Sequence, residues 1–122
     1  MADLAAHLEQ ARKNESTARL LLDAETFDWA ITALFYAALH QLQAYLLQLG
    51  VVPSSHVRRE AEIRKHAELW PIEEAYKLLR AHSENARYEC EPFTRAEFEA
   101  IRSSSYASIV QRLNDLHESR RI

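Results

Sequence analysis

The sequence has little of the turn chemistry that β-rich folds need. Its 122 residues include one glycine, Gly50, and three prolines, too few for the many tight turns of a sandwich or barrel. A single glycine also excludes the glycine-rich phosphate loops of P-loop and Rossmann nucleotide sites, and the Gly-x-Ser-x-Gly elbow of α/β-hydrolases. These absences favour long helices and remove several enzyme classes.

Cysteine and excess positive charge are lacking as well. Cys90 is the only cysteine, so an intrachain disulfide and a multi-cysteine zinc site are excluded, and the chain suits a reducing compartment. Fifteen Lys and Arg against 18 Asp and Glu give a net charge of −3, so any binding of nucleic acid must come from a local patch. The start, MADLAAHLEQ, has no basic region followed by an apolar one, unlike a signal peptide. We predict a cytoplasmic protein.

Helical periodicity covers nearly the whole chain. With 14.1 kDa and 48% hydrophobic residues, residues 1–122 suffice for one domain with a real core and leave no room for a second. The pattern predicts helices over Asp3–Asp23, Phe27–Leu49, His56–Leu69 and Pro71–Tyr88, and a last helix that starts at a capping box formed by Thr94 and Glu97. The predicted fold is all-α, an antiparallel up-and-down four-helix bundle whose third helix is broken at Pro71.

The segment from Phe27 to Leu49 is apolar enough to raise the question of a membrane span. No charged residue occurs between Asp28 and Arg58, and the length meets the need of about 20 residues for crossing a bilayer. Thr32, His40 and several glutamines would, however, lie unpaired in hydrocarbon. We therefore favour a central place in the bundle or a subunit contact, and no membrane.

Two stretches carry the residue types that recognise phosphate. In the first, HVRREAEIRKH, Arg59 and His66 share one face of a predicted helix. Arginine binds phosphate oxygens and histidine moves protons near neutral pH, so Arg59 and His66 are the candidate catalytic residues, with His56 as a candidate phosphate ligand. Glutamates within the stretch also allow a plain solvated helix face.

In the second stretch, Tyr76, Arg80, Ser83 and Arg87 recur at helical intervals and form one stripe. Arg80, Ser83 and Arg87 are candidates for holding successive phosphates, or a base and its phosphate. Neighbouring glutamates offer structural ion pairs as the alternative.

The remaining histidines and the cysteine give no signature of a metal or nucleophile site. Tyr36 and His40 share a face of the apolar helix, where a buried histidine usually bonds to a neighbouring group. No close ligand pair such as HExxH occurs, so we predict neither a metal nor another cofactor. No recognisable base accompanies Cys90, and its role stays open.

Together these segments resemble the HEPN superfamily of small all-helical domains. The likeness lies in ALFYAALHQLQAYLLQLG, SSHVRR, YKLLRAHSENARYEC and SIVQRLNDL. The resemblance implies a helical bundle that forms a homodimer. It also implies that many relatives are metal-independent ribonucleases of toxin–antitoxin or defence systems, often encoded beside a nucleotidyltransferase. In those relatives an arginine neutralises the scissile phosphate, and a histidine a few residues later transfers a proton.

Two pairs of this chain have the spacing of that motif, Arg59 with His66 and Arg112 with His117. Where the family places its motif, near a late helix, this chain has Arg87 and no following histidine. We therefore expect a homodimer that binds nucleotide or RNA phosphate, or a cognate nucleotidyltransferase, without cutting RNA efficiently. The alternatives are a metal-independent ribonuclease and a non-catalytic module for protein–protein interaction.

Overall fold

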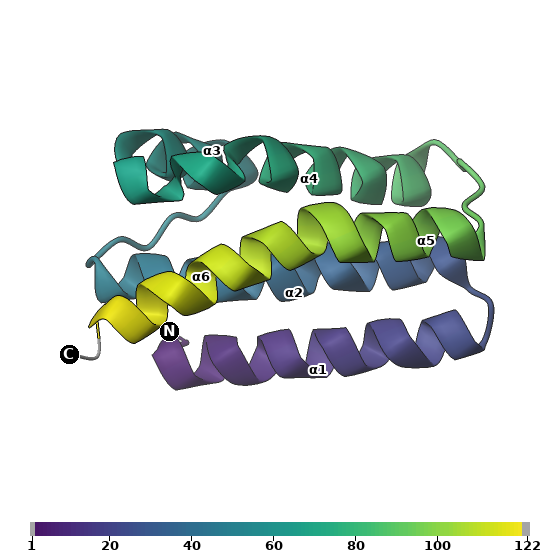
Figure 1. Ribbon diagram of the computed structural model, residues 1–122, viewed down its shortest axis with the longest axis horizontal. Coiled ribbons are helices and arrows are strands. Elements are labelled where there is room, and N and C mark those ends of the chain that lie inside the picture. The colour runs from purple at the N-terminus through teal and green to yellow at the C-terminus, as the bar shows by residue number, and fades with distance from the viewer. Residues whose placement is uncertain (1, 121–122) are drawn as a thin grey trace.

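The computed structural model describes residues 2–120, which form helices joined by short connections (Figure 1). The elements are α1 (Leu4–Asp23), α2 (Phe27–Gln48), α3 (His56–Lys65), the 3₁₀-helix η1 (Ala67–Ile72), α4 (Glu73–Tyr88), α5 (Arg95–Ile101), the π-helix η2 (Arg102–Tyr106) and α6 (Ala107–Arg120). No strand occurs in this range. The predicted all-α class is confirmed.

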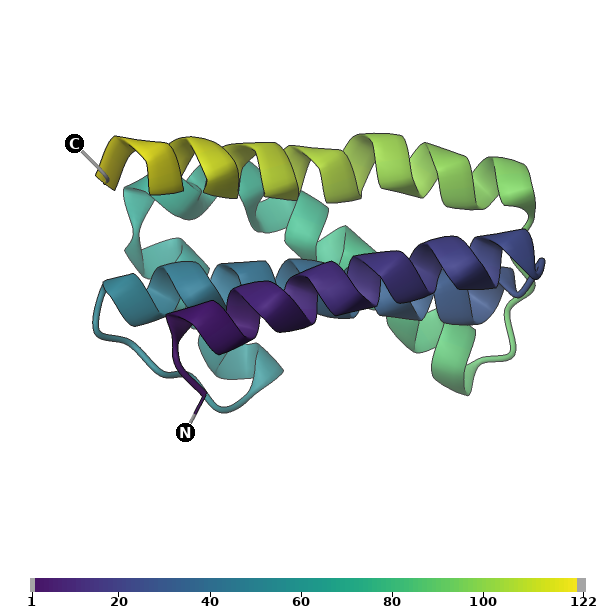
Figure 2. The ribbon, with the colours of Figure 1, turned by 90° about the horizontal axis from the view of Figure 1, so that it is seen from below.

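The last three elements form one continuous rod, as Figure 2 shows. The backbone stays in the right-handed helical region at both junctions. The π-helical stretch coincides with three successive serines, of which Ser103 and Ser104 donate their hydroxyls to carbonyl oxygens one turn back. The described residues thus form five rods, because α3 is a separate short one. The predicted four-helix bundle is wrong in this respect, although successive long rods do run antiparallel (Figure 1).

The break in the third helix comes earlier than predicted. Helix α3 ends at Lys65, and His66 is extended, with φ −114° and ψ 109°. Pro71 lies inside η1, and α4 begins at Glu73 instead of Pro71. Leu69 and Ile72 are fully buried, so the chain turns sharply here to place two apolar side chains in the core.

Caps mark the starts of α1, α3 and α5 and the end of α2, close to their predicted positions. Asp3 and Ser55 accept hydrogen bonds from backbone N–H groups in the first turns of α1 and α3. Thr94 and Glu97 form both bonds of the capping box. Gly50 follows α2 with φ +79°, a left-handed conformation that glycine adopts without strain.

Helix α2 is the centre of the molecule and packs against α1, α4 and the C-terminal rod. Thirteen of its 22 residues are buried, among them Phe35, Leu42 and Leu46 with no more than traces of exposed surface. By length and composition α2 could cross a membrane, but 72% of its apolar window is buried inside the bundle. The prediction of a central position is confirmed, and burial in the core accounts for the hydropathy of this segment.

Candidate anion-binding site

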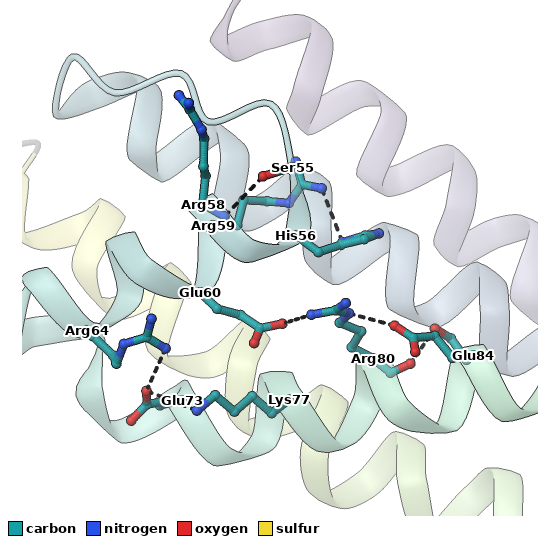
Figure 3. A network of polar contacts seen from close by, with 11 residues as sticks. Ser55, His56, Arg58, Arg59, Glu60, Arg64, Glu73, Lys77, Arg80 and Glu84 are labelled. Carbon is teal, nitrogen blue, oxygen red and sulfur yellow. Dashed lines mark hydrogen bonds and ion pairs between the residues drawn. The ribbon is translucent and has the colours of Figure 1, made fainter.

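Helices α2, α3 and α4 bring several of the predicted site residues together. Ser55 caps α3, which places His56 in the first turn and Arg59 one turn later on the same face. The Arg59 Nη2 atom lies 3.2 Å from the His56 Nδ1 atom (Figure 3). In that contact the guanidinium donates, and His56 accepts through an unprotonated Nδ1.

Arg87 reaches the same place from the last turn of α4. Its guanidinium carbon lies 5.5 Å from the centre of the Tyr36 ring on α2 and 5.1 Å from that of Tyr88. These are cation–π distances. Phe35 forms the aromatic base of the site, because its ring packs against both Tyr36 and His56. We call Tyr36, His56, Arg59 and Arg87 the Arg59–Arg87 cluster.

The environment keeps His56 neutral near neutral pH. Burial lowers the pKa of His56, and the positive charges of Arg59 and Arg80 lower it further; Glu84 raises it by less than either arginine lowers it, and Arg87 has the smallest lowering effect. Burial also raises the pKa of Tyr76, beneath Arg59, to about 12. The cluster therefore combines permanent cations with a neutral imidazole.

The arginines of this region differ in whether a carboxylate neutralises them. Arg80 donates to Glu60 and to Glu84, as Figure 3 shows. Neither Arg59 nor Arg87 has a carboxylate within 4 Å among residues 2–120. The Nε atoms of both arginines, and Nη1 of Arg87, are buried without a hydrogen-bond partner in that range. Buried polar groups are normally hydrogen-bonded, so the fold leaves these N–H groups unsatisfied, and no carboxylate neutralises either guanidinium group.

Arg80 and Ser83, both predicted to bind phosphate, are used by the fold. Glu60 and Glu84 hold Arg80 in ion pairs, which is the structural alternative that the sequence left open for this residue. Ser83 is fully buried and donates its hydroxyl to the carbonyl oxygen of Arg80, at 2.8 Å. The stripe that also contains Tyr76 and Arg87 does lie on one face of α4, but Tyr76 and Ser83 are fully buried in the core.

His66 lies apart from Arg59, its predicted catalytic partner. Because α3 ends at Lys65, His66 does not continue the helix face on which Arg59 lies. Its Nδ1 atom is 4.0 Å from Glu62, and no contact in the described range joins it to Arg59. The structure therefore groups His56, and not His66, with Arg59, and a catalytic role for Arg59 and His66 stays a prediction.

The second pair with motif spacing, Arg112 and His117, is tied to other segments. Arg112 donates from Nε to the carbonyl oxygen of Glu68, at 2.9 Å. His117 Nδ1 lies 2.8 Å from the side-chain nitrogen of Gln48. Both contacts fix α6 to the rest of the bundle, and no contact in the described range joins the two residues to each other.

Sequence reasoning missed His7, which contacts His40, one turn of α2 from Tyr36 of the cluster. His7 on α1 and His40 on α2 have stacked rings 5.2 Å apart, and their Nδ1 atoms are 2.9 Å from each other. Only the antiparallel packing of α1 on α2 joins these two residues, so no local pattern could have revealed the pair.

The open cavity of about 490 Å³ lies on another side of the molecule, between α1 and the C-terminal rod. Its lining is mainly apolar and includes Leu22, Leu34, Phe98 and Val110. None of the predicted site residues lines it.

Among residues 2–120, no group of three or more His, Cys, Asp or Glu side chains is arranged to hold a metal ion. Cys90 is exposed, with φ 54°.

Comparison with protein families matches this chain to the HEPN domain over residues 4–114. A search of curated proteins finds no match. The family match includes every helix from α1 through the greater part of α6, and thus all elements that carry the cluster. The chain therefore belongs to the HEPN domain family.

Proposed function

We propose that this HEPN domain binds the phosphate groups of RNA or of nucleotides at the Arg59–Arg87 cluster. The observation that carries the proposal is the pair of half-buried guanidinium groups that no carboxylate neutralises. A phosphate supplies the missing negative charge and accepts charge-assisted hydrogen bonds, which are about twice as strong as neutral ones.

The aromatic rings around Arg87 favour a ligand that carries a base. Tyr88 is 71% exposed, and the guanidinium group of Arg87 lies at cation–π distance from both the Tyr88 ring and the Tyr36 ring. An exposed tyrosine next to a cation suits stacking of an unpaired base beside its phosphate, and each stacked base contributes about 1–3 kcal/mol. Single-stranded RNA meets both requirements.

Fluorescence anisotropy with a labelled oligouridylate of about ten nucleotides tests the proposal. We expect affinity to fall steeply between about 50 mM and about 200 mM salt, because each phosphate contact releases counterions. Arg59→Gln should weaken binding at least about tenfold, since it removes a charge-assisted contact.

Arg64→Gln is the matched control. Arg64 lies on the same helix, carries the same charge and is 3.8 Å from the carboxylate of Glu73. We expect it to change affinity little. Binding that is insensitive to salt, or equal losses in Arg59→Gln and Arg64→Gln, would contradict a specific site.

RNA cleavage is the second candidate function, and the position of His56 favours it. The lone pair of the neutral imidazole lies on Nδ1, which accepts from Arg59 at 3.2 Å, so Arg59 must turn from His56 to the attacked phosphate before that nitrogen can accept the proton of a ribose 2′-hydroxyl. The 2′-oxygen then bonds to phosphorus, and the departing 5′-oxygen takes a proton from the imidazolium or from water. Expression in a growing bacterium is the test. Loss of intact RNA in the wild type but not in His56→Ala supports cleavage through His56, whereas loss that is abolished only by His66→Ala supports the sequence-based pair.

A homodimer and a nucleotidyltransferase are the partners that we propose. Besides Tyr88, three large apolar side chains are at least half exposed on α3, η1 and α4, namely Val57, Trp70 and Leu78. Exposed apolar groups of this size are available for a protein contact. Measurement of the mass in solution at micromolar concentration, alone and with a nucleotidyltransferase encoded beside this chain, tests both partners. A strict monomer in both samples would contradict them.

A further inference from the structure

The His7–His40 pair has a free hydrogen-bonding side, and His40 lies one turn of α2 from Tyr36 of the Arg59–Arg87 cluster, on the same helix face. The two Nδ1 atoms, 2.9 Å apart, form one hydrogen bond, in which one ring donates and the other accepts. Neither Nε2 atom bonds to a residue within 2–120, and neither is among the fully buried unpartnered atoms. Both Nε2 atoms are therefore available to a ligand.

The charges around the pair are positive. Burial lowers the pKa of His40, and the charges of His7 on α1 and of Arg59 on α3 lower it further. No carboxylate opposes this effect at His40, and Glu84 is the one acidic group that does so at His56. The two histidines and Arg59 are thus surrounded by basic groups, and the acidic Glu84 lies farther along, at His56.

We propose that the phosphate site extends from Arg59 onto the His7–His40 pair, which binds a second phosphodiester of the same single-stranded RNA and takes up a proton from solvent in doing so. The inference rests on the proposed function, because the first phosphodiester must bind at the Arg59–Arg87 cluster. An anion beside an imidazole favours its charged form, so binding of the second phosphodiester and protonation of the pair strengthen each other.

The test compares UpU with UpUpU, both without terminal phosphates. The first has one phosphodiester and the second has two, and these groups stay ionised between about pH 6 and about pH 8, where histidine titrates. Calorimetry at about pH 6 and at about pH 8 gives the ratio of the affinity for UpUpU to the affinity for UpU at each pH. We expect the ratio to rise about tenfold in favour of UpUpU at the lower pH, and buffers of different ionisation enthalpy to show net proton uptake.

His40→Asn should abolish this rise and leave the affinity for UpU unchanged, because asparagine offers a nitrogen near the Nδ1 position but no titratable group. His82→Asn is the matched control, since the His82 ring packs on Phe93 at 6.1 Å and lies outside the basic groups described above. If the helix content of His40→Asn is reduced, His7→Asn makes the same test from α1.

The extension would be overturned if the affinity ratio of UpUpU to UpU does not change with pH, or if its rise at low pH survives in both His40→Asn and His7→Asn, while the cluster itself still binds UpU. Absence of binding of either ligand at both pH values would instead overturn the proposed function, and the extension with it.

Discussion

The C-terminal rod and the edge formed by α2, α3 and α4 differ in how their polar groups are satisfied. On the rod, Tyr106 donates to Glu15 of α1 at 2.5 Å, and Arg112 donates to the carbonyl oxygen of Glu68. At the edge, Arg59 and Arg87 have no carboxylate partner among the described residues. Contacts of the first kind stabilise the fold, whereas unneutralised cations cost stability and are retained where a ligand needs them.

Ile109→Ala, on the rod, should have the largest effect on stability. Ile109 is fully buried in the core, so its truncation should lower the free energy of unfolding by about 2–5 kcal/mol. Urea denaturation measures this loss, and the folded fraction should bind oligouridylate as the wild type does. A reduced affinity of the folded protein would contradict the assignment of stability to the rod and of RNA binding to the edge.

Tyr106→Phe should have the next largest effect. The substitution leaves the partly buried carboxylate of Glu15 without its donor, which costs about 1–3 kcal/mol. Glu15→Gln keeps an acceptor for the tyrosine hydroxyl and should cost less. Thermal unfolding of the two variants compares them, and an equal loss in both would show that the hydrogen bond contributes little.

Acid should weaken the edge by a smaller amount. Burial lowers the pKa values of His40 and His56 below 6.5, so the unfolded chain binds more protons than the folded one just below that pH. Their contribution to stability is therefore present above pH 6.5 and is lost as the pH falls through the folded-state pKa values. Urea denaturation of a double variant with His40→Asn and His56→Asn should show a flatter pH dependence than the wild type; a steeper one would contradict this account.

Local patterns predicted the helices and their caps because capping and periodicity depend on residues a few positions apart. The Thr94–Glu97 box is an example. The end of α3 was misplaced because burial of Leu69 and Ile72, a tertiary effect, overrides the preference to continue the helix to Pro71.

The candidate site was predicted in part. His56, Arg59 and Arg87 were among the predicted residues, but the sequence paired Arg59 with His66 and not with His56. The partners of Arg80 and the contact between His7 and His40 depend on which helices pack together. Sequence periodicity does not encode that information, and so it could not tell the neutralised arginine from the free ones.

The most direct test measures stability and RNA affinity together for Arg87→Gln and Arg80→Gln, two equal charge changes two turns apart on α4. Arg80→Gln should lower the free energy of unfolding by about 1–3 kcal/mol, because it leaves Glu60 partly buried and unpaired, and should leave affinity nearly unchanged. Arg87→Gln should weaken RNA binding at least about tenfold, and should lower stability less than Arg80→Gln does, because it removes only contacts with the Tyr36 and Tyr88 rings. The opposite pattern, with stability lost in Arg87→Gln and affinity lost in Arg80→Gln, would contradict the assignment of the unneutralised arginines to ligand binding.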